Sequence, residues 1–145
     1  MEYMSDKLVE LIERNAKQLS TNWLRDVRKH PNTPTYHEYN EEELYKRVFD
    51  VYSRLSKWIS RDTSKEDIYK HYFALGLQRR KEGFALSEVI QALIITRRHI
   101  WIKVMAEGFL DTALDMYKAL ELNNRVILFF DRAIHYTALG YENVD

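Results

Sequence analysis

The sequence predicts an all-α fold in which five helices joined by short loops form a bundle. Only four glycines and two prolines occur among 145 residues, so long stretches are free to be helical. Apolar residues recur at three- and four-residue spacing, and we find no strand-like alternation, internal repeat or low-complexity segment. A chain of this length predicts one helical domain over residues 1–145.

The first two predicted helices cover residues 5–29 and 40–60. Ser5 is the candidate N-cap of the first helix, which ends at Pro31 because proline cannot continue the helical hydrogen-bond ladder. Asn40 is followed by three glutamates, which favour the positive end of a helix dipole. A capped second helix is therefore predicted to start there.

The third predicted helix covers residues 64–83. Ser64 and Asp67 have the spacing of an N-terminal cap, and Gly83 is predicted to end the helix in a left-handed conformation. Gly76 lies inside the helix, where glycine costs about 1 kcal/mol relative to alanine. We therefore expect a close helix crossing at Gly76.

The fourth predicted helix, residues 86–106, is the stretch around which the chain is expected to pack. Its broad apolar face runs from Leu86 through Leu93 to Trp101 and Val104, and a narrower apolar stripe lies behind it. The helix therefore requires neighbours on two sides.

The last predicted helix starts at a cap on Asp111 or Thr112 and reaches Leu139, with Gly140 as its end signal. It also has two apolar stripes, separated by charged residues. Two such helices have more apolar surface than one chain is expected to cover, so we predict a homodimer. The candidate interface residues on the second stripes are Ile95, Ile102, Leu122, Val126 and Phe129.

Composition excludes several classes of partner and site. The 22 acidic and 22 basic residues give a formal net charge of zero, so nothing favours nucleic acid as a partner. Cysteine is absent, which excludes disulfides and thiolate metal sites. No signal peptide is recognisable, and charged residues interrupt the most apolar window, so no membrane partner is expected. We predict a cytoplasmic location.

Motifs for catalysis are also missing. The sequence contains no Glu-x-x-His, His-Glu-x-x-His, glycine-rich phosphate loop or Gly-x-Ser-x-Gly element. We therefore predict a protein that is not an enzyme, with no catalytic residue, metal site or cofactor. A helical hydrolase is a distant alternative, favoured only by a cleft with perturbed carboxylates.

Two polar residues on the fourth helix are candidate ligand contacts. Arg97 lies near the centre of the apolar face, where the favoured interpretation is that its stem packs while its guanidinium reaches an acid or a carbonyl at the bundle edge. A ligand carboxylate or a subunit contact is the alternative. His99 lies on the narrower stripe, as a haem ligand in a globin-like bundle would. A hydrogen-bonded interface histidine is favoured there, and His71 and His135 are weaker candidates.

Several short signals recur along nearly the whole chain in a characteristic order: Trp23, Leu75-Gly76 with Arg79, Gly83-Phe84, Leu86 with Glu88, Arg98, Trp101 and Gly140-Tyr141. This order resembles the N-terminal sensor domain of the RsbT co-antagonist family, the regulatory subunits of bacterial stressosomes. Similar domains precede histidine kinases and other output modules.

The resemblance implies a globin-like input domain without catalysis that dimerises and signals through its last helix. We therefore predict a sensor domain of a bacterial stress-response or two-component regulator, with an output domain or a regulatory protein as partner. Family members usually continue into an output domain, whereas this sequence ends at Asp145. Either an excised or a free-standing input domain is expected. The alternative is a haem or small-ligand binding globin-like protein that uses His99 and Arg97.

Overall fold

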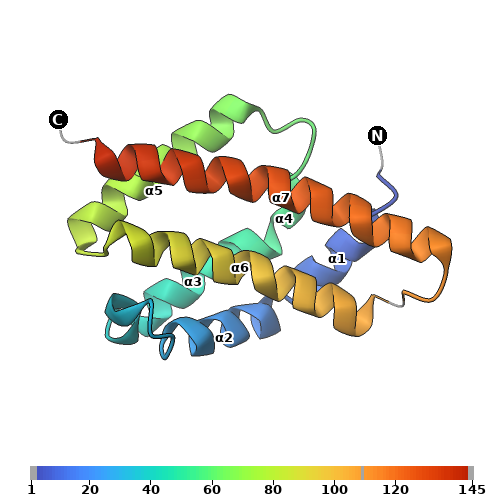
Figure 1. Cartoon of the computed structure of the whole chain (residues 1–145), viewed down its shortest axis with the longest axis horizontal. Coiled ribbons are helices and arrows are strands. Elements are labelled where there is room, and N and C mark those ends of the chain that lie inside the picture. Colours follow the sequence, from blue (N-terminus) through green and yellow to red (C-terminus); the bar gives the residue numbers. More distant parts are fainter. Residues whose placement is uncertain (1–2, 109, 144–145) are drawn as a thin grey trace.

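The computed structural model describes residues 3–108 and 110–143, and this part of the chain is all-helical (Figure 1). Residues 1–2, 109 and 144–145 of the predicted domain lie outside the described residues. The helices are α1 (Asp6–Arg14), α2 (Ala16–Val27), α3 (Glu41–Ser53), α4 (Leu55–Trp58), α5 (Lys65–Glu82), α6 (Leu86–Glu107) and α7 (Ala113–Glu142), with a 3-10 helix, η1 (Pro34–His37), before α3.

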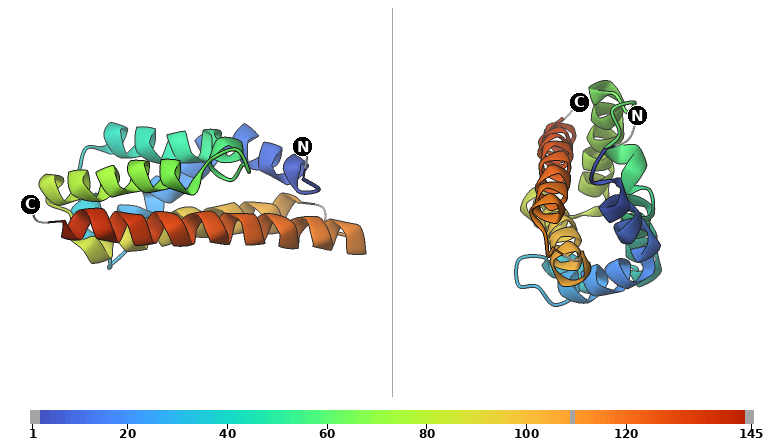
Figure 2. Two further views of the ribbon diagram at one scale, coloured as in Figure 1. Left: turned by 90° about the horizontal axis from the view of Figure 1, so that it is seen from above. Right: turned by 90° about the vertical axis from the view of Figure 1, so that its right-hand side faces the viewer.

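The helices form two layers. α6 and α7 run side by side in one layer, while α1, α3, α4 and α5 lie in the opposite layer and α2 closes one edge (Figure 2). α5 packs on α7 over the largest area, and α2 packs on both α3 and α6. Among the described residues, no helix has both the length and the apolar character needed to cross a bilayer.

The helical stretches predicted for residues 5–29 and 40–60 are each divided in two. The backbone leaves helical geometry at Asn15 (φ −106°, ψ 21°) and at Arg54 (φ −124°, ψ 28°). At the first break the Asn15 side-chain amide donates to the Leu11 carbonyl at 2.8 Å, which replaces a backbone hydrogen bond of the last turn. The breaks let the two halves of each stretch face the core at different angles.

Most predicted helix ends are confirmed. The side chains of Asn40, Ser64 and Thr112 each accept a hydrogen bond from a backbone amide of the first turn. Gly83 ends α5 at a φ of 92°, in the left-handed region that glycine adopts without strain. Ser5 was predicted as a cap, but its hydroxyl instead donates to the Glu121 carboxylate at 2.9 Å. Ser5 therefore joins the start of α1 to α7.

The close crossing predicted at Gly76 is confirmed, and it involves a second glycine. A Cβ atom on Gly76 would lie 2.1 Å from the Thr137 carbonyl oxygen, and one on Gly140 would lie 2.0 Å from the Phe73 carbonyl oxygen. The backbones of α5 and α7 are thus in direct contact. The prediction that Gly140 ends the last helix is wrong, because α7 continues to Glu142 and Gly140 lies buried within it.

The buried face of α6 differs from the predicted one. Val89, Ala92, Ile95, Ile100 and Val104 are buried, together with several polar side chains of the same helix. By contrast, four other residues of the predicted broad face are only half-buried: Leu86, Ile90, Leu93 and Ile94. A polar residue at a buried position shifts the apparent apolar face, so periodicity alone misplaced the core side of this helix.

Candidate functional site

The structure corrects most of the predicted interface. Ile95, Leu122, Val126 and Phe129 are buried within the single chain, so they are not available to a second copy. Only Ile102 of the five candidates is on the surface, with 51% of its area exposed. The second apolar stripes of the two helices are largely covered by the other layer of the same chain.

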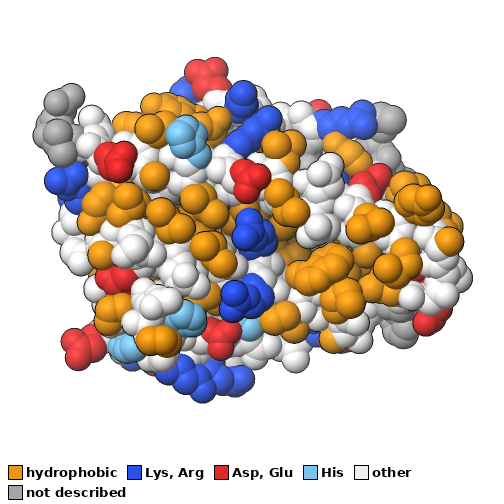
Figure 3. Space-filling view, viewed as in Figure 1, with side chains coloured by type: hydrophobic (Ala, Val, Ile, Leu, Met, Phe, Trp, Pro, Cys, Tyr) orange, Lys and Arg blue, Asp and Glu red, His pale blue; other side chains and the backbone are white. Residues whose placement is uncertain are grey.

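A different set of side chains leaves an apolar surface on the outside of the α6–α7 layer. Figure 3 shows apolar side chains gathered over the end of α6 and the start of α7. We call this surface the α6–α7 face; its exposed members on α6 and α7 are Trp101, Ile102, Met105, Met116, Leu120 and Ile127. On α6 these members follow helical spacing, so they form one stripe.

Arg97 lies at the edge of a shallow groove within this face. The groove has a volume of about 380 Å³ and is also lined by Trp101, Ile102 and Ile127. The Arg97 guanidinium approaches the Asp131 carboxylate of α7 at 3.9 Å, and a third of its side chain is exposed. This agrees with the interpretation in which the guanidinium reaches an acid at the bundle edge.

His99 is engaged by another helix of the same chain. Its Nε2 atom lies 2.5 Å from a carboxylate oxygen of Asp26 on α2, and the ring is buried. The Nε2 atom of His99 is therefore paired with a carboxylate of the same chain. No group of three or more His, Asp or Glu side chains among the described residues could hold a metal ion.

The two weaker histidine candidates also lie apart from each other. His71 packs against Trp58, with ring centroids 4.7 Å apart, and lines a pocket described below. His135 is exposed on α7, and its ring centroid is 5.7 Å from that of Tyr136. Neither is paired with Arg97 or His99.

A second apolar site is a pocket between α3 and α5. We call it the α3–α5 pocket; it has a volume of about 490 Å³, within the range of about 300–1,000 Å³ typical of ligand pockets. Its apolar lining comes from α2, α3, α5 and α6, and includes Trp23, Leu44, Val48, Leu75, Val89 and Leu93. Its polar lining includes Tyr36, Arg47, Asp50, Tyr72, Gln78 and Arg79.

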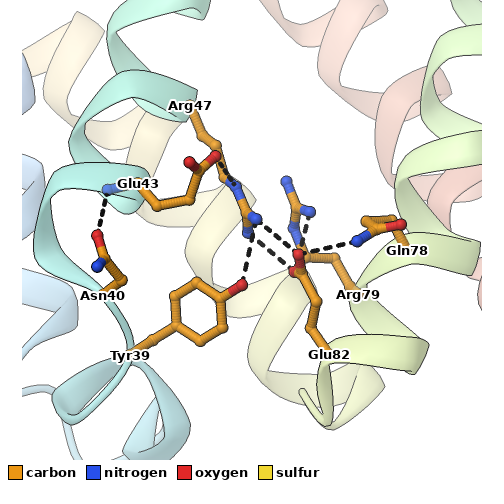
Figure 4. Close-up of polar contacts among 7 residues, drawn as sticks. All are labelled: Tyr39, Asn40, Glu43, Arg47, Gln78, Arg79 and Glu82. Atoms are coloured by element: carbon orange, nitrogen blue, oxygen red, sulfur yellow. Dashed lines mark hydrogen bonds and ion pairs between the residues drawn. The ribbon is translucent and has the colours of Figure 1, made fainter.

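A cluster of charged residues connects α3 to α5 beside this pocket (Figure 4). Arg47 of α3 donates to both carboxylate oxygens of Glu82 on α5, at 2.9 and 2.6 Å. The same guanidinium donates to the Glu43 carboxylate at 3.1 Å and to the Tyr39 hydroxyl at 3.3 Å. Arg79 donates to Glu82 through Nη1 alone, at 3.2 Å. Glu82 is therefore shared by two arginines.

The cluster sets the protonation of its members. Burial alone would raise the pKa of the Glu82 carboxyl, but hydrogen bonds from Arg47 and Gln78 and the charge of Arg79 lower it to about 2. Burial lowers the pKa of Arg79, and the charge of Arg47 lowers it further. Arginine still remains charged at neutral pH, because its ordinary pKa is above about 12. Two half-buried cations thus lie close together.

Sequence reasoning did not identify this pocket. Helical spacing places Tyr72 and Arg79 on one stripe of α5, and both line the pocket, but spacing gives Arg47 a place on or near the solvent side of α3. In the structure the Arg47 side chain is 20% exposed and turned toward Glu82. The spacing within α3 gave no signal for this, because the partner carboxylate comes from α5.

Comparison of the chain with protein-family models, with curated proteins and with solved structures finds no match in any of the three. The likeness to the sensor domains of the RsbT co-antagonist family therefore stays a prediction.

Proposed function

We propose that this chain is a non-catalytic signal-input domain of a bacterial stress-response or two-component regulator. It acts by pairing with a second copy through the α6–α7 face and by passing a change in packing along α7. Its target is an output domain or a regulatory partner protein. The proposal takes its signalling class from the resemblance, and the observation that carries it is the exposed apolar face on the two longest helices.

The chemistry of the α6–α7 face favours a protein partner. Isoleucine, leucine, methionine and tryptophan side chains lie there with more than a third of their areas exposed. Monomeric proteins rarely leave large contiguous apolar surfaces exposed, and such patches commonly mark interaction sites. A second copy would present the same stripes, and two-fold symmetric pairing is the commonest arrangement for such a surface.

The proposed signal path runs through α7. The first half of this helix contributes to the α6–α7 face, and its second half contacts α5 at the Gly76–Gly140 crossing. A displacement of α5 is therefore transmitted to the end of α7 without intervening side chains. Domains with bistable packing use such helix shifts to signal.

The proposal includes a globin-like plan of five helices. Counting each divided stretch as one bent helix, α1–α2 and α3–α4, gives five units with α5, α6 and α7. Several residues that carry the resemblance also occupy constrained positions, which supports the likeness. Gly76 and Gly140 form the crossing and Gly83 is the left-handed cap.

The oligomeric state tests this function. We expect the wild-type chain to sediment as a dimer at high micromolar concentration, and an Ile102→Glu/Leu120→Glu variant to sediment as a monomer with an unchanged helical circular-dichroism spectrum. Both substitutions place a charge in the α6–α7 face, where pairing would bury it at a high cost.

A matched control uses an exposed aromatic residue in the opposite layer. Tyr69 of α5 is also more than a third exposed, and Tyr69→Glu should leave the dimer intact. A wild-type chain that stays monomeric at high micromolar concentration would contradict the proposed function. So would a dimer that is dissociated by Tyr69→Glu but not by the double substitution.

A further inference from the structure

The α3–α5 pocket has two arginines at its polar side, and they differ in how many of their N–H donors already have an acceptor. All three guanidinium nitrogens of Arg47 donate hydrogen bonds, and their acceptors are Glu43, Glu82 and Tyr39. Arg79, with 12% of its side chain exposed, donates only through Nη1 to one oxygen of Glu82. A guanidinium has five N–H donors, so most of those on Arg79 remain open to a further acceptor.

A second polar group in the same pocket has no partner. The Tyr72 side chain is 1% exposed, lines the pocket, and its hydroxyl has no hydrogen-bond partner among the described residues. Burial raises the pKa of Tyr72, so the hydroxyl stays protonated and can donate. Leaving a buried hydroxyl unpaired costs free energy, which an acceptor in the pocket would recover.

Much of the remaining lining is apolar. Trp23, Leu75, Val89 and Leu93 come from three different helices and face the same space. An apolar body would be buried against them, while an anionic end could reach Arg79. The pocket thus offers one charged end and one hydrophobic wall.

We propose that the α3–α5 pocket binds a small monocarboxylic acid with an apolar body, whose carboxylate is held by Arg79 and Tyr72. The planar guanidinium fork matches the two oxygens of a carboxylate. This site does not depend on the α6–α7 face. Its role as the stimulus of the domain does rest on the proposed function.

A dianion such as phosphate fits this pocket less well. Asp50 lines the pocket and the Glu82 carboxylate is bonded to its two arginines, and like charges close together repel each other. Arg54 offsets Asp50 at 3.2 Å, but it is half-exposed and belongs to the outer surface. A single negative charge with a hydrophobic tail suits the remaining donors.

The position of Arg79 suggests how an occupant would be sensed. Arg79 follows Gly76 by one helical turn on α5, and Gly76 lies against α7. A ligand carboxylate bound to Arg79 would share this guanidinium with Glu82, which is also the acceptor of Arg47 on α3. Binding would therefore act on the residue that links α5 to α3. That effect reaches α7 through the backbone contact.

The test is a calorimetric titration of the full chain with octanoate, 1-octanol, octylammonium and inorganic phosphate. We expect saturable binding of octanoate, at least about 10-fold weaker binding of octanol, and no binding of octylammonium or phosphate. Arg79→Gln should weaken octanoate binding at least about 10-fold. The control Lys81→Gln removes an exposed positive charge from the same helix and should leave octanoate binding unchanged.

A second variant tests the pocket independently in case the Arg79→Gln chain does not fold. Leu93→Trp fills the pocket from α6 while keeping every charge, and it should abolish octanoate binding in a chain that unfolds cooperatively. Equal affinity for octanoate and octanol, no octanoate binding at millimolar concentration, or full binding by a folded Arg79→Gln chain would each overturn the proposal. If a monomeric chain binds octanoate, the pocket proposal holds and the dimer proposal fails. If the chain is a dimer that does not bind octanoate, the dimer proposal holds and the pocket proposal fails.

Discussion

Glu82 keeps a charged carboxylate although only 11% of its side chain is exposed. Arg47 and Gln78 donate hydrogen bonds to it, and the resulting pKa of about 2 lies below the ordinary value of 4.5. A depressed pKa in the folded state means that the charged form of Glu82 stabilises the fold. This stabilisation is fully present above pH 4.5 and is lost as the pH falls toward 2.

The Glu82 contribution can be measured from the pH dependence of unfolding. The free energy of unfolding of the wild-type chain should fall as the pH drops from 4.5 to 2, with Glu82 supplying on the order of 3 kcal/mol of the change. Glu82→Gln should flatten this part of the urea-unfolding profile. Glu10→Gln, at an exposed position of α1, should leave the slope as in the wild type, and equal slopes for all three chains would contradict the assignment.

For His99 and Arg97, the sequence predicts the face of the helix on which each lies but not the residue with which each pairs. Both lie on α6, and helical spacing correctly placed them on different faces. Their partners, Asp26 on α2 and Asp131 on α7, come from distant parts of the chain. Spacing along one helix holds no information about such partners, so the carboxylate that binds His99 could not be predicted.

At the scale of the elements, α5 and α7 cross with their backbones in direct contact. The crossing requires glycine on both helices, because a Cβ on either one would overlap a backbone carbonyl of the other. Backbone atoms cannot rotate away as a flexible side chain can. The two helices are therefore fixed in position along each other.

Two glycine substitutions distinguish the steric overlap at the crossing from the effect of a positive φ alone. Gly76→Ala should destabilise the chain by about 3 kcal/mol or more, although alanine gains about 1 kcal/mol in helix propensity. Gly83→Ala meets no atom within 4 Å and suffers only from its φ of 92°, so it should cost about 1 kcal/mol. Chemical denaturation followed by circular dichroism gives both values. A Gly76→Ala chain as stable as the wild type would contradict the crossing.

The helices and their caps were predicted more accurately than the residues that pack against them. Helix caps such as Asn40, Ser64 and Gly83 depend on a few neighbouring residues, so the sequence was sufficient to locate them. The breaks at Asn15 and Arg54 were missed, since neither glycine nor proline marks them. The dimer candidates Ile95 and Phe129 were misassigned, because an apolar stripe indicates burial without indicating which neighbour supplies it.

The α3–α5 pocket could not be predicted because it is a property of the whole molecule. Its lining comes from α2, η1, α3, α5 and α6, which are separated widely along the chain. Individual residues such as Arg79 and Tyr72 were recognised on one face of a helix. The space in front of them exists only because α3 packs on α2 while α5 packs on α7, which leaves α3 and α5 apart.

Amide hydrogen exchange tests whether the pocket and the last helix are coupled across the molecule. We expect saturating octanoate to slow exchange in α5 and in the second half of α7, while α1 exchanges at its free rate. Arg79→Gln should remove both effects. Protection confined to α5 would show that occupancy of the pocket is not passed to α7.

The length of α7 gives the Gly76–Gly140 contact a mechanical consequence. The thirty residues of α7 extend for about 45 Å, and the Gly76–Gly140 contact with α5 lies near one end of this helix. A small tilt about that contact would swing the far end, next to Leu120, through a much larger arc than the end at Tyr141. Under the proposed function, the chain would act as a lever with its fulcrum at the paired glycines, so that a small displacement near Arg79 would become a larger one where a second copy binds.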